Sequence, residues 1–289
     1  MSGREKEQVD AFLNDFTDSL ASEFSNRIDF ILLFGSAARG EFKKGVSDLD
    51  IIIQVKDKKD VIKVEKFSES IFWKLDKKYD LKLKDACSSK KDMLSRIQRG
   101  FKLYKPFEVI GPDDINWKEG KITDPSLVAW GVIAPVQQFA KKLKSEGKIL
   151  YGRNILDDMR IRESLFDKAK ALIIPTLISL ASVPISIFLP DRGIKLSAKA
   201  IFYSVDDQLF VMGKDPKKKS TLNLKILKNE LGELYSVRLA KEAFEIKRNF
   251  PEVKKNWTYI DKVAFCFQSV VYIQHNNLLS FFSYLGNLF

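Results

Sequence analysis

Histidine and cysteine are nearly absent from this sequence, and their scarcity excludes several kinds of site. The chain has one histidine, His275, and two cysteines, Cys87 and Cys266, with no Cys-x-x-Cys pair. A structural zinc site needs clustered Cys or His ligands and is not expected, and a disulfide scaffold is excluded. So few cysteines suit a reducing cytosol, and we expect a cytoplasmic protein. Catalysis should therefore use carboxylates, hydroxyls, lysine and arginine.

We expect neither a signal peptide nor an unbroken apolar span of membrane length from this sequence. Residues 1–8 are polar and mixed in charge, without the apolar core of a signal peptide. Residues 171–189 carry no charge over nearly the length of a membrane span, but Pro175 and Pro184 interrupt them and four hydroxyl side chains dilute them. We favour a buried helix followed by an irregular turn, with a membrane span as the alternative. No membrane association is expected.

What the sequence does contain is enough apolar material for a sizeable core and a surplus of positive charge. The chain has 289 residues, of which 45% are hydrophobic and 12% aromatic, so it is not disordered. At roughly 100–200 residues per domain, this length predicts two domains. Lys and Arg total 49 against 38 Asp and Glu, a net charge of +11. That surplus suits a nucleotide, a nucleic acid or an anionic surface, or simply a solvated lysine-rich exterior.

The hydropathy pattern changes near residue 115, which predicts an α+β domain over residues 1–115 and a mostly helical domain over residues 116–289. In the first part, strands are expected at residues 29–34, 48–55, 79–84 and 107–110, and helices at 5–25, 59–78 and 88–99. In the second part, helical patterns cover residues 125–146, 157–182, 196–212, 219–249 and 257–287. The expected fold is a small sheet with flanking helices, followed by helices.

The segment Leu-Phe-Gly-Ser-Ala-Ala-Arg-Gly-Glu, residues 33–41, has the composition of a phosphate-binding turn. It follows a predicted buried strand, and Gly35 would let the backbone approach a ligand closely. Ser36 offers a hydroxyl and, if a helix begins there, free backbone N–H groups suited to phosphate. Arg39 could add a charge-assisted contact, although pairing with a neighbour on a helix is its alternative role.

Two aspartates at strand spacing point to a metal site. Asp48 and Asp50 would leave the same face of one strand, where two carboxylates repel unless a cation neutralises them. Mg²⁺ accepts oxygen ligands and is shared with substrate phosphates. Asp80, in the segment predicted as a third strand, could supply a further carboxylate and make a two-metal site conceivable. The alternative is that all three are surface charges.

Together these residues carry a family resemblance. Gly35-Ser36, eleven residues, and then Asp48-x-Asp50, with Asp80 later, resembles the DNA polymerase β-like nucleotidyltransferase superfamily. The longer form, Gly-Ser-x-Ala-Arg-Gly followed by Ser-Asp-x-Asp, resembles the minimal nucleotidyltransferases of prokaryotes. A helical domain after it is similar to the arrangement in kanamycin nucleotidyltransferase. The resemblance spans about residues 28–85.

The resemblance implies roles for six residues. Gly35 and Ser36 would hold the triphosphate, with Arg39 a further nucleotide-binding residue. Asp48 and Asp50 would bind Mg²⁺. Asp80 would ligate metal or act as the base, although Asp76 and Asp85 lie nearby in the sequence.

The activity implied is Mg²⁺-dependent transfer of a nucleoside monophosphate from an NTP, with ATP the expected donor, to an acceptor hydroxyl with release of pyrophosphate. The acceptor could be a small molecule or a protein. An RNA-end nucleotidyltransferase is one alternative and a non-catalytic nucleotide-binding sensor or scaffold another. His275 lacks an Arg four to six residues upstream, which argues against the RNase motif of helical toxin domains. The apolar C-terminal helices predict internal packing or, alternatively, a homo-oligomer or protein-partner surface.

The segment 147–153, Gly-Lys-Ile-Leu-Tyr-Gly-Arg, resembles the Leu-Tyr-Gly segment near the end of such nucleotidyltransferase domains. It could line the cleft, and a plain connection between helices is the alternative.

Overall fold

The structure, a computed structural model, describes residues 3–45, 47–83, 107–123, 136–215 and 220–286. The chain divides into two compact units, and each is described by itself. The first comprises residues 1–126 and 140–161, and the second residues 127–139 and 162–289.

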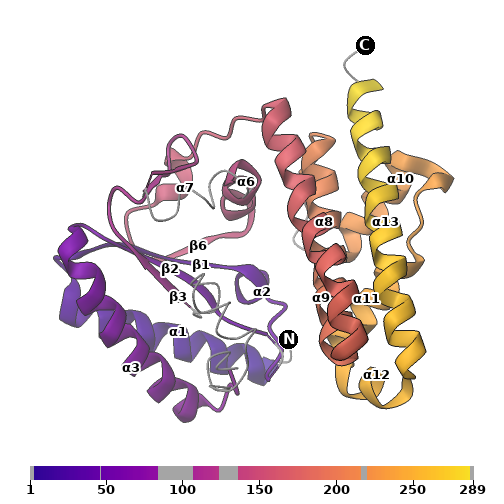
Figure 1. Cartoon of the computed structure of the whole chain (residues 1–289). Helices are drawn as coiled ribbons and strands as arrows, with labels where there is room; N and C mark the ends of the chain where they lie inside the picture. The colour runs from indigo at the N-terminus through magenta and orange to yellow at the C-terminus, as the bar shows by residue number, and fades with distance from the viewer. Residues whose placement is uncertain (1–2, 46, 84–106, 124–135, 216–219, 287–289) are drawn as a thin grey trace. The chain divides into compact units, whose positions relative to one another are not determined.

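A mixed four-stranded sheet forms the centre of the first unit (Figure 1). Its order is β3 (Phe107–Ile110), β2 (Asp50–Val55), β1 (Ile28–Phe34) and β6 (Lys148–Gly152). β1 is antiparallel to both β2 and β6, while β3 runs parallel to β2 at the edge. A two-stranded ribbon, β4 (Ile115–Asn116) with β5 (Lys121–Ile122), lies apart from this sheet.

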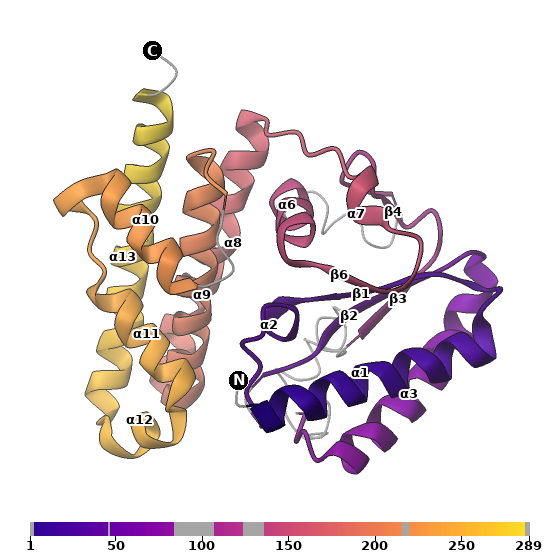
Figure 2. The same cartoon turned by 180° about the vertical axis from the view of Figure 1, so that it is seen from behind.

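Helices cover both faces of the sheet, which explains why β1 and β2 are continuous apolar runs. α1 (Gly3–Phe24) and α3 (Val61–Tyr79), the latter preceded by the 3₁₀ turn η1 (Lys58–Asp60), lie on one face, with α6 (Val136–Glu146) and α7 (Ile155–Asp158) on the other (Figure 2). Ile31 and Leu33 of β1 join the core under α1, built on buried rings such as Phe12 and Phe16. Phe30 and Leu32 alternate with them toward the opposite face.

Most elements of this unit agree with the sequence expectations, but the third strand does not. β1, β2 and β3 confirm three predicted strands, although β2 begins at Asp50 rather than at Asp48. The strand expected at residues 79–84 is wrong, because Tyr79 ends α3 and both Asp80 and Lys82 have left-handed backbone conformations with positive φ. The helix expected at 88–99 lies outside the described residues.

The fourth strand comes from beyond the predicted domain boundary. The segment 147–153 lies beyond the predicted boundary but resembles the end of a nucleotidyltransferase domain; it forms β6, which pairs with β1 over residues 148–152 and is not a plain connection between helices. Residues 140–161 consequently belong to the first unit, whereas the sequence pattern places the boundary at 115/116. The pattern could not show this, because β6 is five residues long and has no buried residue.

The second unit is helical, as predicted. Its long helices are α8 (Leu165–Phe188), α9 (Pro190–Val211) and α13 (Tyr259–Gly286), and α9 contacts both of the others. Shorter helices complete it: α10 (Ser220–Leu231), η2 (Gly232–Leu234), α11 (Arg238–Arg248) and α12 (Phe250–Asn256). The single helix expected over 219–249 is wrong, because Gly232 adopts a positive φ and the chain turns there. The overall class is α+β followed by helices.

The uncharged stretch 171–189 is neither a buried helix nor broken by a turn, contrary to the favoured expectation. α8 runs through Pro175 and Pro184 to Phe188. Within the described part of the chain it is the one helix long and apolar enough to cross a membrane, and 28% of its most apolar window is buried. Length and composition of one helix are weak evidence for a span. Hydroxyls on α8 donate to its own carbonyls, as Ser179 Oγ does to Thr176 O at 2.8 Å.

Candidate functional site

The predicted Gly-Ser turn and the Asp50 carboxylate meet at one end of the sheet. β1 ends at Phe34, which pairs with Asp50 at the start of β2. The chain then enters α2 (Gly35–Ala38), a single helical turn. The sheet register therefore delivers Gly35 and Asp50 to the same place, although fifteen positions separate them in the sequence.

Gly35 is required at this turn for two reasons. Its φ is +72°, a conformation that residues with a side chain rarely adopt. A Cβ at this position would lie 2.0 Å from Asp50 Oδ2, which no real contact allows. The Asp50 carboxylate thus occupies the space that a side chain on residue 35 would fill.

The Asp50 carboxyl group sits in an environment that disfavours its charge. It accepts no hydrogen bond from the described part of the chain. Burial, followed by the neighbouring negative charge of Asp48, raises its pKa to about 6, although the cations of Lys142 and Arg39 oppose the change. A bound cation would stabilise the charged form of this carboxylate, because its positive charge would offset the effects of burial and of Asp48.

The other two polar residues of the predicted motif, Asp48 and Ser36, differ in their exposure to solvent. Asp48 precedes β2 and is exposed, and its charge acts on Asp50. Ser36 is half-buried, and in the described chain its hydroxyl has no hydrogen-bond partner. The hydroxyl is therefore available to a ligand at the Gly-Ser turn.

Glu146, which the sequence analysis missed, joins this site from the last position of α6. Its Oε1 accepts a hydrogen bond from the Gly35 N–H at 3.2 Å, and its Oε2 lies 2.7 Å from Arg39 Nη1. Glu146 is 7% exposed, and Arg39 also pairs with Glu41 at 3.0 Å. Arg39 thus helps to hold the turn through two carboxylates. The local sequence gave no signal for Glu146, because its partner lies 111 positions away.

Lys142 lies one helical turn before Glu146 on α6, so both point to the same side. Its positive charge lowers the pKa of Asp50, against the larger effects of burial and Asp48. α6 therefore brings one cation and one carboxylate to the Asp50 end of the sheet.

Asp80 is placed differently from the other predicted residues. It forms the left-handed C-cap of α3, is exposed, and pairs with Lys44 at 2.5 Å. The hydrogen bond from Lys44 lowers its pKa. The charges that shift the pKa of Asp50 are those of Asp48, Lys142, Arg39 and Glu146, and Asp80 is not among them. Of the alternatives in the same sequence segment, Asp76 accepts from Leu83 N–H, and Asp85 lies outside the described residues.

Asp48 and Asp50 could bind a hard divalent cation as two carboxylate ligands, but they do not form a complete coordination shell by themselves. Among the described residues no group of three His, Cys, Asp or Glu side chains is arranged to hold a metal ion. Asp48 and Asp50 offer oxygen ligands, which Mg²⁺ prefers, and Mg²⁺ commonly uses one or two carboxylates together with substrate phosphates. The Asp50 carboxylate, which accepts no hydrogen bond within the described part of the chain, is the observation that favours such a cation.

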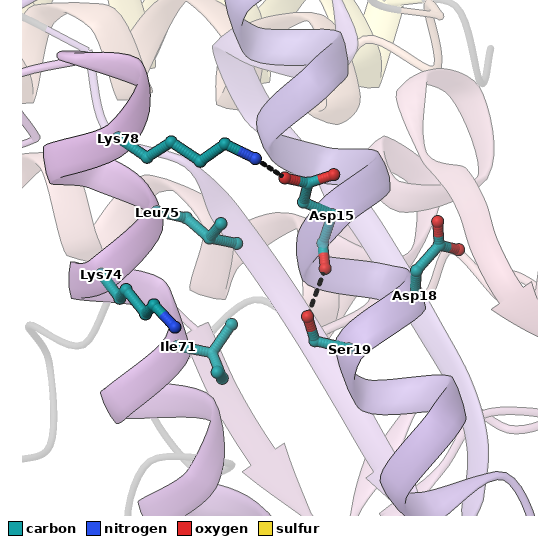
Figure 3. A pocket seen from close by; sticks show the side chains of 7 residues that line it. All are labelled: Asp15, Asp18, Ser19, Ile71, Lys74, Leu75 and Lys78. Carbon is teal, nitrogen blue, oxygen red and sulfur yellow. Dashed lines mark hydrogen bonds and ion pairs between the residues drawn. The ribbon is translucent and has the colours of Figure 1, made fainter.

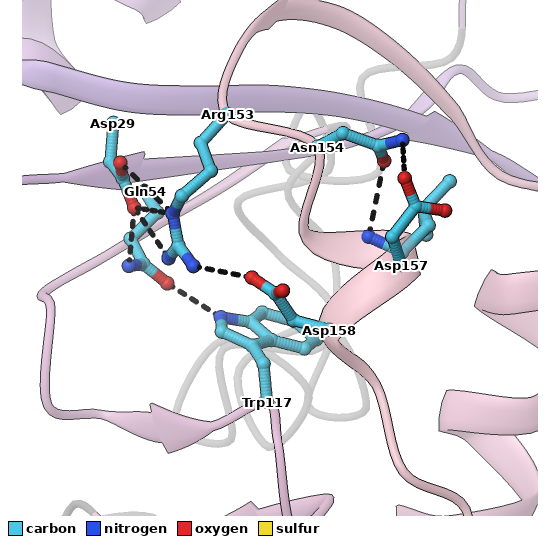
Figure 4. Close-up of polar contacts among 8 residues, drawn as sticks. Asp29, Gln54, Trp117, Arg153, Asn154, Asp157 and Asp158 are labelled. Carbon is cyan, nitrogen blue, oxygen red and sulfur yellow. Dashed lines mark hydrogen bonds and ion pairs between the residues drawn. The ribbon is translucent and has the colours of Figure 1, made fainter.

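The segment 147–153 runs along β1 from the end near the Gly-Ser turn to the opposite end of the sheet. Lys148 pairs with Leu33 near the turn, whereas Arg153 reaches Asp29 at the start of β1, with Nη2 2.8 Å from Oδ2 (Figure 4). Gln54 donates to the same Asp29 carboxylate and accepts from Trp117 Nε1. This network ties three strands together about four residues, or roughly 13 Å, from the Asp50 end.

A surface hollow between α1 and α3 contains none of the predicted site residues (Figure 3). Its lining comes from the two helices: Asp15, Asp18, Ser19, Ile71, Lys74, Leu75 and Lys78. The Lys78 Nζ–Asp15 Oδ2 ion pair of 2.6 Å joins the helices across it. In the second unit, His275 Nε2 lies 3.2 Å from Leu234 O, a contact that links α13 to η2.

Comparison with known proteins finds one family match, and it lies within the first unit. Residues 13–101 match the family model described as a nucleotidyltransferase domain. The matched range includes β1, the Gly-Ser turn, Asp48, Asp50 and Asp80. No curated protein and no solved structure gives a significant match.

Proposed function

We propose that this protein is a Mg²⁺-dependent enzyme that transfers a nucleoside monophosphate from an NTP to an acceptor hydroxyl. The premise is that residues 13–101 belong to the DNA polymerase β-like nucleotidyltransferase superfamily. The observation that carries the proposal is the Asp50 carboxylate, which packs on Gly35 beside Asp48 and accepts no hydrogen bond from the residues that the structure describes. Such a pair next to a Gly-Ser turn suits a metal-bound triphosphate.

Each residue at the site has a proposed role. The Ser36 hydroxyl would bind the triphosphate at the turn, and Gly35 would let the Asp50 carboxylate pack directly against that turn. Asp48 and Asp50 would hold Mg²⁺, which when bound neutralises charge on the phosphates. Arg39 would act mainly by keeping the turn in place through Glu146.

The reaction balances as a single substitution at the α-phosphorus. The acceptor oxygen forms a bond to this phosphorus, and the bond to the bridging oxygen breaks in line, so pyrophosphate leaves with the electron pair. The acceptor proton passes to a base or to solvent. The resemblance offers Asp80 as a metal ligand or base, but its exposed position and its ion pair with Lys44 leave the proposed metal pair to Asp48 and Asp50.

We also propose which nucleotide is the donor and which class of molecule is the acceptor. ATP is the donor to test first, and the acceptor is proposed to be a small molecule or a protein. An RNA end is the alternative that the net charge of +11 would favour. We place the activity in the cytoplasm, which the buried free thiol of Cys266 suits.

One observation favours a second candidate, a nucleotide-binding sensor or scaffold without catalysis. Among the described residues Asp80 is paired with Lys44 and no three-carboxylate metal group is present. A protein of this kind would bind the NTP and release it unchanged.

The test is transfer of label from each α-labelled NTP in the presence of Mg²⁺, with and without cell extract. We expect label on a small molecule or a protein, and loss of at least about 100-fold in rate for Asp48→Asn or Asp50→Asn, because each removes a charge from the metal pair. Asp57→Asn, just beyond β2 and paired with Lys59, is the matched control and should retain activity.

The outcomes separate the candidates. Label on RNA alone would favour the RNA-end enzyme. Nucleotide binding without transfer from any NTP would favour the sensor, and full activity in the Asp50→Asn variant would refute the site.

A further inference from the structure

Two long helices of the second unit, α8 and α13, have their large apolar side chains on the outside. On α8, Phe166, Leu177 and Leu180 are 66%, 50% and 49% exposed. The buried face of the same helix instead carries Ser179, Ser182 and Ser186. The packing inside this unit therefore does not account for the outer apolar residues, which are unusual for a surface helix.

α13 repeats this distribution. Ile260, Phe267, Val271 and Leu278 are each more than half exposed, at 75%, 53%, 70% and 56%. Its buried positions include Ser269, Asn276, Asn277 and Ser280. The buried side of α13 therefore mixes polar residues with core side chains such as Phe265 and Ile273, while large apolar residues lie on its outer side, as on α8.

The exposed residues recur at seven-residue intervals. On α8 the series is Phe166, Ile173, Leu180 and Ile187. On α13, Ile260 and Phe267 are seven apart, as are Val271 and Leu278. Apolar residues at this repeat form the seam by which one helix packs against another. The spacing therefore points to a helical partner.

The two helices lie side by side and antiparallel (Figure 1). Because each keeps its large apolar residues exposed, these residues lie on the outside of the helix pair. Tyr259 at the start of α13 donates to Ile187 O at 3.0 Å, near the end of α8. Asn277 donates to Thr176 Oγ1 at 3.3 Å, in the middle of α8. We call the outer surface of this pair the α8–α13 face.

The α8–α13 face carries no charged side chain over most of its length. No Asp, Glu, Lys or Arg occurs in residues 171–189 or 263–289. Two chains of net charge +11 repel each other, so an uncharged face is where two copies can approach. A helix that rests on anionic lipid typically has lysine and arginine beside its apolar residues, and here these stretches have none.

The face is also large enough for a stable dimer. About ten half-exposed Leu, Ile, Val and Phe side chains present on the order of 1,000 Å², against about 800 Å² per partner in a standard interface. An exposed apolar patch of this size on a monomer marks an interaction site.

We propose that a second copy of this chain docks on the α8–α13 face, giving a twofold dimer in which α8 and α13 of each copy pack against those of the other. The same uncharged, heptad-spaced surface is present on both copies, as a twofold interface requires.

Light scattering on the whole 289-residue chain tests this dimer. We expect a mass twice the 33.2 kDa of the chain at micromolar concentration. Leu177→Glu/Val271→Glu should weaken dimerisation by at least about 100-fold, because like charges meet across the twofold axis. Leu234→Glu is the control, since Leu234 is 68% exposed and lies in η2, outside the face.

A mixing experiment distinguishes an interface from misfolding. Leu177→Lys/Val271→Lys should also be monomeric alone, and mixing it with the Glu variant should restore a dimer through opposite charges. A monomeric wild type would overturn the proposal, as would a dimer unaffected by either double variant. Flotation of a monomeric wild type with vesicles of anionic and neutral lipid would overturn it in favour of a bilayer surface.

Discussion

Residue 35 has to be glycine because a carboxylate occupies the space beside it. We predict that Gly35→Ala abolishes nucleotide transfer and lowers the free energy of unfolding by about 1–3 kcal/mol, since it adds backbone strain and displaces Asp50. Gly40→Ala is the matched control: its φ of +74° is similar, but nothing lies within 4 Å of an added Cβ. Thermal unfolding and the labelled-NTP assay measure both. Equal effects in the two variants would show that strain, not the Asp50 contact, matters.

The pKa of Asp50 gives a pH dependence with a definite sign. Its folded pKa of about 6 lies above the ordinary 3.8, so metal-free protein loses stability as the pH rises between these values. In EDTA, Asp50→Asn should be more stable than wild type at pH 7.5 by up to about 3 kcal/mol. This advantage should shrink toward pH 4.5.

Urea unfolding at both pH values measures this difference. Asp57→Asn is the control, because Lys59 lowers the pKa of Asp57. Its free energy of unfolding relative to wild type should not increase as the pH rises. A pH-independent advantage of Asp50→Asn would contradict the prediction.

At the scale of elements, the close packing of α8 on α9 depends on a glycine. A Cβ on Gly193 would lie 2.4 Å from Ser186 Cβ and 2.6 Å from Ser186 Cα. We predict that Gly193→Ala destabilises the protein by about 1–3 kcal/mol, because overpacking against fixed backbone outweighs the better helix propensity of alanine. Gly286→Ala, also helical but with no neighbour within 4 Å, should be nearly neutral in the same unfolding measurement. A stabilised Gly193→Ala variant would show that the helices can separate.

The sequence predicts a helix or strand well where the local hydropathy pattern determines it, and poorly where distant pairing does. β1 and β2 were predictable because both of their faces are buried, which makes each a continuous apolar run. Residues 79–84 alternate as a strand does, but the left-handed Asp80 ends a helix there. The motif Gly-Ser followed by Asp-x-Asp was enough to predict the candidate site residues Gly35, Ser36, Asp48 and Asp50. Glu146 and β6 depend on pairing across more than a hundred residues, which periodicity does not record.

At the scale of the whole molecule, the first unit is discontinuous in sequence, which makes truncation informative. We predict that fragment 1–115 fails to fold, because it leaves β1 without β6 and Gly35 without Glu146. Fragment 1–161 keeps both and should be soluble, with a cooperative thermal transition. Circular dichroism on the two fragments tests this. A folded fragment 1–115 that binds nucleotide would show that β6 is dispensable.

The return of the chain to pair β6 with β1 also affects the timing of folding during synthesis. β1 leaves the ribosome well before its partner, and roughly 100 further residues must be made, which takes on the order of ten seconds at ~5–20 residues per second. Throughout that interval one edge of β1 is open to other chains. Glu146 emerges just before β6, so the turn at Gly35 gains its Glu146 contact only after about half of the chain has been made, when that edge closes.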